Sequence, residues 1–269
     1  MRGEAEQNCF DIVKCRLDKE IYFAMSYEDE EIIKAAFSEA NANPILSEFP
    51  DFIYNDGFIE HFQVTSSYEN KRKGSKMKIE KSSIDRDFQK REAEASQNVK
   101  EGQITIQSIS TPPYFHKTHS YDNFRKSFDC NFLDHIDSLN KYKGNKNHKI
   151  FMIEYSDAVL RMAKKYPEDL LLQVSYGDLY VRENPSYRIS RDINMLRYIY
   201  EKREIIDYVI FVNDSNMKDI QVDIVNTRNA LEIIKLLHEG YEVHCAIVAS
   251  AQTGISITIP DKLNDSSIS

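Results

Sequence analysis

Two short aromatic-rich runs separated by a tight turn form the clearest pattern in the chain. The first run covers residues 52–54 and the second covers residues 58–64, with Asp56-Gly57 between them. An Asp-Gly pair between two apolar runs is a strong signal for a β-hairpin. The pattern therefore predicts two antiparallel strands, paired side by side, within residues 44–67.

Apolar residues at helical spacing predict several helices. One is expected over residues 26–40, where Ser26 as N-cap and Asp29 three positions later form the pattern of a capping box. A second is expected from Phe124, because apolar residues recur every three or four positions as far as Leu139. Further helices are predicted over residues 84–98, 158–166, 190–200 and 227–238.

Short runs rich in β-branched and apolar residues predict strands between these helices. The strands are expected at 149–155, 170–174, 179–181, 208–212, 220–225, 241–248 and 255–259. Strands that alternate with helices are typical of α/β proteins. The sequence therefore predicts the α/β fold class, with helices packed against a sheet.

Residues 67–125 differ in character from the rest of the chain, because they are mostly polar and charged. A basic run opens this segment, with only Glu80 as an acidic residue among Lys71, Arg72, Lys73, Lys76, Lys78 and Lys81. Farther on, Ile104, Ile106 and Ile109 alternate with polar residues as in a strand. We interpret 67–125 as an insertion or flexible arm within a single domain that covers residues 1–269.

Composition narrows the classes of protein that the chain fits. The net charge of −8 argues against a protein that coats nucleic acid, although a local basic face would still allow binding to it. The four cysteines are scattered without a Cys-x-x-Cys pair, which favours free thiols in a reducing compartment. The polar, acidic N-terminus does not resemble a signal peptide, and no apolar run is long enough for a membrane span. We therefore expect a cytoplasmic protein without membrane contact.

Two carboxylates interrupt the aromatic runs of the predicted hairpin. Asp51 stands near the start of the first strand and Glu60 stands within the second, nine positions later. A hairpin would bring the two side chains together, and a carboxylate in so apolar a strand is costly to bury unless it is paired or bound to a metal. Glu154 is a third acid inside an apolar strand, and it either pairs with a core lysine or arginine or assists the same site.

The hairpin and its two acids resemble the core of PD-(D/E)XK nucleases, which have a restriction endonuclease-like fold. Pro50-Asp51-Phe52 followed by Ile59-Glu60-His61-Phe62 is similar to the variant found beside some DNA helicases of the helicase IV type. The resemblance implies a mixed central sheet flanked by helices and metal-dependent cleavage of phosphodiester bonds, in DNA rather than RNA. It also implies Mg²⁺ or Mn²⁺ as cofactor, held by Asp51, Glu60 and the backbone carbonyl of His61.

The chain departs from this family at the lysine that should follow the glutamate by two positions, because Phe62 stands there. Gln63 is the candidate to orient the attacking water, but it would point to the opposite face of a regular strand unless a bulge re-aims it. The basic residues Lys71, Arg72, Lys73, Lys76 and Lys78 either form a solvated face or contact phosphates.

Two functions follow from these observations. The first is a metal-dependent endonuclease with Asp51, Glu60 and Gln63 as catalytic residues. The second is an inactive nuclease-like fold that binds a protein or nucleic acid, which the missing lysine favours. The Asn-, Lys- and Tyr-rich composition fits a bacterial or phage defence or mobile-element setting, with a protein partner in a multi-subunit system as one form of it.

Overall fold

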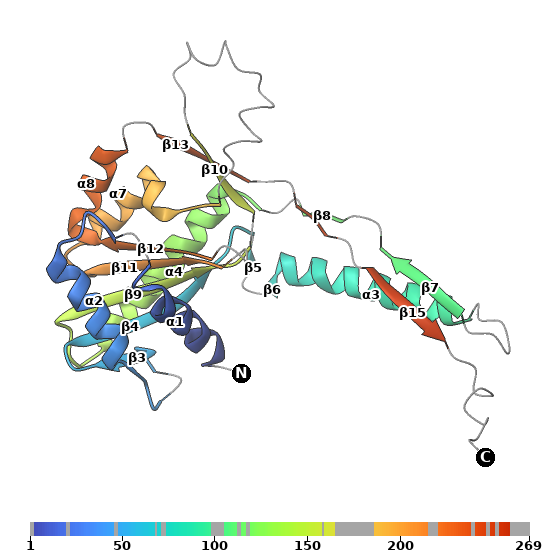
Figure 1. Ribbon diagram of the computed structural model, residues 1–269, viewed down its shortest axis with the longest axis horizontal. Coiled ribbons are helices and arrows are strands. Elements are labelled where there is room, and N and C mark those ends of the chain that lie inside the picture. The colour runs from blue at the N-terminus through green and yellow to red at the C-terminus, as the bar shows by residue number, and fades with distance from the viewer. Residues whose placement is uncertain are drawn as a thin grey trace, which may run out of the picture. The chain divides into compact units, whose positions relative to one another are not determined.

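The structure is a computed structural model, and its contacts divide the chain into two units (Figure 1). Unit 1 comprises Met1–Ser66 and Ser120–Ala246, and unit 2 comprises Ser67–His119 and Ile247–Ser269. The residues described are 3–19, 22–45, 48–67, 69–70, 74–97, 105–111, 114–116, 119–157, 159–164, 186–214, 220–237, 240–245, 248–250 and 253–258.

Unit 1 is built around a mixed seven-stranded sheet. Its strands, in spatial order, are β1 (Tyr22–Phe23), β12 (Gln221–Asn226), β11 (Tyr208–Asn213), β9 (His148–Tyr155), β4 (Gly57–Val64), β3 (Phe52–Tyr54) and β2 (Asn41–Ala42). The central strands β4, β9 and β11 run parallel, whereas β2, β3 and β4 form an antiparallel meander. The predicted hairpin, the predicted strands at 149–155, 208–212 and 220–225, and the α/β class are confirmed.

Helices cover both faces of this sheet, and each face has its own apolar core (Figure 1). On one face pack α1 (Glu4–Arg16) and α2 (Tyr27–Glu39). On the other pack α4 (Tyr121–Lys141), α7 (Ile193–Glu201) and α8 (Ala230–Leu236). Short 3-10 helices, η1 (Ile189–Arg191) and η2 (Thr227–Asn229), precede α7 and α8.

Local sequence explains the helices that the periodicity predicts. Ser26 Oγ accepts a hydrogen bond from the Asp29 N–H at 3.1 Å, and the Asp29 carboxylate accepts the Ser26 N–H at 3.0 Å, so the capping box forms. One stripe of apolar residues on α4 faces the sheet and is buried: Phe124, Phe128, Phe132, Ile136 and Leu139. Burial of this stripe is what fixes α4 on the sheet.

Unit 2 contains residues 67–119 of the predicted polar segment together with the C-terminal part of the chain, whereas residues 120–125 belong to unit 1, where α4 begins at Tyr121. Its helix α3 (Lys76–Gln97) begins earlier than the predicted 84–98. The strand predicted from Ile106 and Ile109 is β7 (Thr105–Ser110), which pairs with β15 (Thr253–Thr258). The other pairs are β8 (Tyr114–His116) with β14 (Val248–Ser250) and β5 (Glu69–Asn70) with β6 (Gly74–Ser75).

Several predictions need correction. The helix predicted over 158–166 is wrong, because Leu160–Lys164 forms strand β10 and pairs with β13 (Tyr241–Cys245). Leu160 and Met162 are both fully buried, so the buried residues repeat every two positions, as they do in a strand. Packing against the partner strand stabilises this segment more than a helix would. The helix α1 was not predicted, and the strands expected at 170–174 and 179–181 lie outside the described residues. Among the helices described, none combines the length and apolarity needed to cross a membrane.

We expect Phe132→Ala to lower the free energy of unfolding by about 3–5 kcal/mol, because a buried ring is replaced by a cavity. The ring packs against Phe128 and Phe151, with centroid distances of 5.6 Å and 5.0 Å. The matched control is Leu133→Ala, since Leu133 is the next residue of α4 and is 42% exposed. Its loss should stay within about 1 kcal/mol in urea denaturation. Equal losses in the two variants would contradict the packing of α4 described above.

Candidate active site

The alternation of side chains along β4 divides its polar residues between the two faces of the sheet. Phe58, Phe62 and Val64 lie in the core under α4, whereas Ile59 lies in the core under α1 and α2. Since side chains alternate with a period of two, Glu60 shares the α4 face with Phe62. His61 and Gln63 share the opposite face.

Asp51 and Glu60 lie together at the open end of the hairpin. Phe52 pairs with Ile59, so Asp51, one residue before β3, stands beside Glu60. The Asp51 N–H donates to Glu60 Oε2 at 3.0 Å, and the His61 N–H donates to Asp51 Oδ2 at 2.8 Å. Glu60 is only 5% exposed. The hairpin therefore brings together the two acids that the sequence singles out, together with the backbone of His61.

A residue that the sequence analysis missed completes this cluster. His135 of α4 places Nδ1 at 2.6 Å from Glu60 Oε1, and its ring stacks on Phe62 with centroids 4.6 Å apart. Phe62 occupies the position where the family resemblance requires lysine, and it supports an imidazole instead. A signal for His135 exists in the sequence, because it follows Phe132 by three residues and so continues the apolar stripe of α4.

Burial raises the pKa values of both acids. The pKa of Asp51 lies above its usual value, because burial outweighs the hydrogen bond from the His61 N–H. Burial raises the pKa of Glu60 to about 7, with the negative charge of Asp51 acting in the same direction and the hydrogen bond to His135 acting against it. Two carboxylates so close together resist double ionisation, and a cation beside them would relieve that cost.

Gln63 does not lie with Asp51 and Glu60. Residues 57–64 of β4 pair with 148–155 of β9 in unbroken register, so no bulge re-aims its side chain. Gln63 Nε2 donates to Glu154 Oε2 at 2.9 Å, and His61 Nε2 lies 3.0 Å from the same oxygen. Glu154 thus pairs with histidine and glutamine, instead of the lysine or arginine considered from the sequence, and it faces away from Glu60.

Cys9 of α1 joins His61, Gln63 and Glu154 in a second cluster of polar residues, which also includes Asp214. One ligand atom each from Cys9, His61 and Glu154 lies within 4.8 Å of the other two. Burial raises the pKa of the Cys9 thiol, and the charges of Glu154 and Asp214 add to the effect. Sequence patterns singled out Glu154 and Gln63 but gave no signal for Cys9 or Asp214, because both are remote from the hairpin along the chain.

The acids of the second cluster influence each other. Burial and the neighbouring charge of Glu154 raise the pKa of Asp214 to about 6. Burial also opposes ionisation of Glu154, but hydrogen bonds from His61 and Gln63 outweigh it and lower the pKa below the usual value. Glu154 therefore ionises at a lower pH than Asp214.

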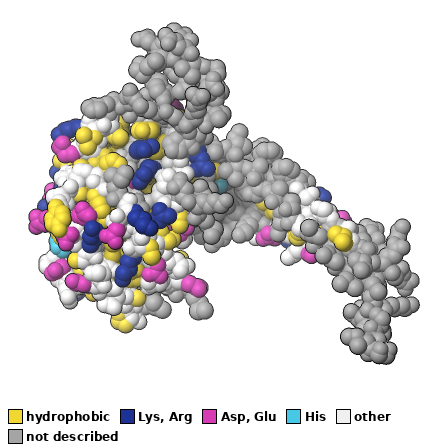
Figure 2. Space-filling view, viewed as in Figure 1, with side chains coloured by type: hydrophobic (Ala, Val, Ile, Leu, Met, Phe, Trp, Pro, Cys, Tyr) yellow, Lys and Arg dark blue, Asp and Glu magenta, His cyan; other side chains and the backbone are white. Residues whose placement is uncertain are grey.

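The predicted nucleic-acid-binding residues lie where the structure gives no side-chain description. Lys71, Arg72 and Lys73 are outside the described residues, and Lys76 and Lys78 belong to α3 without described side chains. Figure 2 shows basic, acidic and apolar side chains interspersed over the visible described surface. Phosphate contacts by the basic run therefore remain a prediction.

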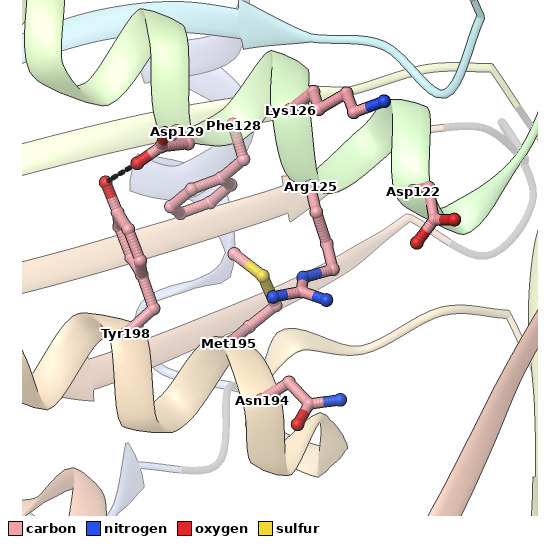
Figure 3. A pocket seen from close by; sticks show the side chains of 8 residues that line it. All are labelled: Asp122, Arg125, Lys126, Phe128, Asp129, Asn194, Met195 and Tyr198. Atoms are coloured by element: carbon pink, nitrogen blue, oxygen red, sulfur yellow. Dashed lines mark hydrogen bonds between the residues drawn. The ribbon is translucent and has the colours of Figure 1, made fainter.

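A pocket of about 460 Å³ opens between α4 and α7, away from both clusters (Figure 3). Its lining residues are Asp122, Arg125, Lys126, Phe128, Asp129, Asn194, Met195 and Tyr198. The Tyr198 hydroxyl donates to Asp129 Oδ1 at 2.8 Å, which joins the two helices at one end of the pocket. The basic and acidic side chains are mixed within it, so the lining favours no single charge of ligand.

Comparison of the chain with protein-family models, with curated proteins and with solved structures finds no match. Functional inference therefore depends on the geometry of the two clusters.

The raised pKa of Glu60 predicts a specific pH dependence of stability in metal-free protein. The folded-state pKa of about 7 exceeds the ordinary 4.5, so the stabilisation from the protonated form is present below pH 4.5 and is lost as pH rises through 7. Glu60→Gln avoids this loss. Relative to wild type, its free energy of unfolding should rise by about 2–3 kcal/mol between pH 5 and pH 8.

Urea denaturation at the two pH values, with chelator present, measures this difference. The control is Asp56→Asn, which removes an exposed carboxylate from the turn of the same hairpin. Its difference from wild type should be nearly constant with pH. A constant difference for Glu60→Gln as well would show that Glu60 titrates normally.

Proposed function

We propose that the chain is a metal-dependent nuclease that hydrolyses phosphodiester bonds, with DNA as the expected substrate and Asp51 and Glu60 as metal ligands. The observation that carries this proposal is the meeting of half-buried Asp51 and buried Glu60 at the end of the hairpin, where the Asp51 N–H donates to Glu60 and His135 lies 2.6 Å from Glu60. The order α2, β2–β3–β4, α4 and β9 also agrees with the restriction endonuclease-like core that the sequence resembles.

The donor atoms at this site fit Mg²⁺ or Mn²⁺. Both ions prefer oxygen ligands, and Mg²⁺ is commonly held by one or two carboxylates with waters in its other positions. Asp51 and Glu60 would supply these carboxylates, and the backbone carbonyl of His61 is the third donor implied by the resemblance. The bound ion would lower the pKa of a water molecule and offset negative charge on the phosphate.

His135 takes the role that the family assigns to its lysine. Its imidazole lies on the same face as Glu60 and is held flat against Phe62. A histidine there accepts a proton from water or, when protonated, places a positive charge beside the scissile phosphate. Gln63 has no part in this assignment, since it is bonded to Glu154 on the other face.

The alternative is a fold that binds nucleic acid or a partner protein without cutting. The reciprocal hydrogen bonds of Asp51 favour it, because a carboxylate that accepts a backbone N–H also has a purely structural use in ending the hairpin ladder. Metal binding separates the two functions, since only the nuclease requires the acids to hold a cation.

We expect Mn²⁺- or Mg²⁺-dependent cleavage of DNA by the wild-type chain. Asp51→Asn and Glu60→Gln should each lower the cleavage rate at least about 100-fold, because each removes a charged ligand. His135→Gln should lower the rate about 10²- to 10⁴-fold while leaving Mn²⁺ affinity nearly unchanged, because the imidazole acts on the reaction and not on the ion. Plasmid, linear duplex and single-stranded DNA are the substrates, and calorimetry measures Mn²⁺ binding.

Asp56→Asn is the control, since it removes an exposed carboxylate from the turn of the same hairpin, outside both clusters. It should retain cleavage. Cleavage that survives Glu60→Gln would refute the assignment of the site. Absence of both cleavage and Mn²⁺ binding in the wild-type chain would favour the binding module.

A further inference from the structure

The second cluster lies at the carboxyl ends of the three parallel strands of the sheet. Gln63 is near the end of β4, Glu154 near the end of β9, and Asp214 directly follows β11. In open α/β sheets, ligands commonly bind just beyond the carboxyl ends of parallel strands. Cys9 of α1 closes this position from the α1 face.

The cluster is polar within an otherwise apolar layer. Cys9 is 1% exposed and His61 is 6% exposed, and both border the core formed by α1, α2 and the sheet. Asp214 Oδ1 is buried and has no hydrogen-bond partner among the described residues. Buried polar groups are costly unless they are paired or coordinate a metal, so this combination of side chains requires an explanation.

We infer that Cys9, His61 and Glu154 form a binding site for a zinc ion, with Asp214 as the fourth ligand. This site is distinct from the Asp51–Glu60 pair and does not depend on the proposed nuclease activity. One sulfur, one imidazole nitrogen and carboxylate oxygens form a ligand set typical of Zn²⁺, whereas Mg²⁺ and Ca²⁺ prefer oxygen alone.

The geometry is close to that of a zinc site. Zinc bonds of about 2.0–2.3 Å set tetrahedral ligand atoms roughly 3.3–3.8 Å apart, so side chains within 4.8 Å need to close by about 1 Å. His61 Nε2 and Glu154 Oε2 are already 3.0 Å apart and face the same point. Gln63, which is exposed, donates to Glu154 and would hold its carboxylate in the binding orientation.

Zinc binding requires protons to leave the ligand atoms. The Cys9 thiol releases its proton to solvent when the sulfur–zinc bond forms. His61 donates its Nε2 proton to Glu154 in the metal-free chain, so on binding that proton passes to solvent while Nδ1 takes one up, and the neutral ring offers the Nε2 lone pair. The hydrogen bond between His61 and Glu154 is thereby replaced by one bond from each side chain to the ion. A nucleophilic role for Cys9 is excluded by its burial, because no substrate reaches a thiol that is 1% exposed.

Cobalt(II) is a direct probe, because a thiolate ligand gives a sulfur-to-cobalt charge-transfer absorption in the near ultraviolet. The full chain, reduced and freed of metal with chelator, is titrated with Co²⁺ and then with Zn²⁺. We expect the absorption to saturate at one Co²⁺ per chain and to vanish when Zn²⁺ is added. In Asp51→Asn, which lacks a ligand of the proposed Mg²⁺ site, Zn²⁺ but not Mg²⁺ should also raise the melting temperature, because Zn²⁺ binds only the folded chain.

Cys9→Ala should abolish the cobalt absorption, and Glu154→Gln should weaken Co²⁺ and Zn²⁺ binding at least about tenfold. Cys15→Ala is the matched control, because Cys15 lies on the same helix and is exposed, and it should retain the absorption. Asp51→Asn should also retain it, which separates this site from the nuclease site. If Cys9→Ala does not fold, Cys9→Ser provides the same test.

Absence of the thiolate absorption in the wild-type chain would overturn the proposal without recourse to any variant. An absorption that persists in folded Cys9→Ala, or that is lost in Cys15→Ala, would also overturn it. Retention of zinc binding in the absence of DNA cleavage would refute only the nuclease.

Discussion

The pairing of β4 with β9 is the constraint on which both clusters depend. Eight consecutive residue pairs join these parallel strands, from Gly57 with His148 to Val64 with Tyr155. A shift of one residue would exchange every side chain between the two faces. It would place Glu60 under α1 and bury His61 among the aromatic rings of α4. The aromatic residues on either side of Glu60 prevent this shift, because Phe58 and Phe62 fit only the α4 face.

The docking of α4 on the sheet then determines the chemistry on that face. Phe128 and Phe132 pack on the sheet, and the same helical turn delivers His135 to Glu60. His61 links the two faces, because its N–H bonds to Asp51 while its ring bonds to Glu154. An ion held by the ring would therefore also restrain the backbone that positions Asp51. Through this strand, the proposed zinc site on one face would restrain the proposed metal ligands on the other.

Local sequence patterns identify the helices and strands whose buried face can be recognised from a few neighbouring residues. The hairpin, α4 and the strands β9, β11 and β12 follow from periodicity and turn chemistry, because their apolar residues repeat at the spacing of the element. Strand β10 does not follow, since its identity depends on pairing with β13, about eighty residues later in the chain. The helix α1 has only three buried residues among polar ones, and its weak stripe resembles a solvated segment.

The sequence likewise reveals only some of the residues in the two candidate sites. Asp51 and Glu60 are recognisable because a charged residue in an apolar strand conflicts with its surroundings. His135 continues an apolar stripe, so its polarity is the only signal, and its partner is set by how α4 lies on β4. Cys9 gives no signal, because a buried cysteine behaves as a small apolar residue until a histidine and a carboxylate approach its sulfur. Only the sheet with α1 packed against it brings those three groups together, and the proposed zinc site depends on that packing.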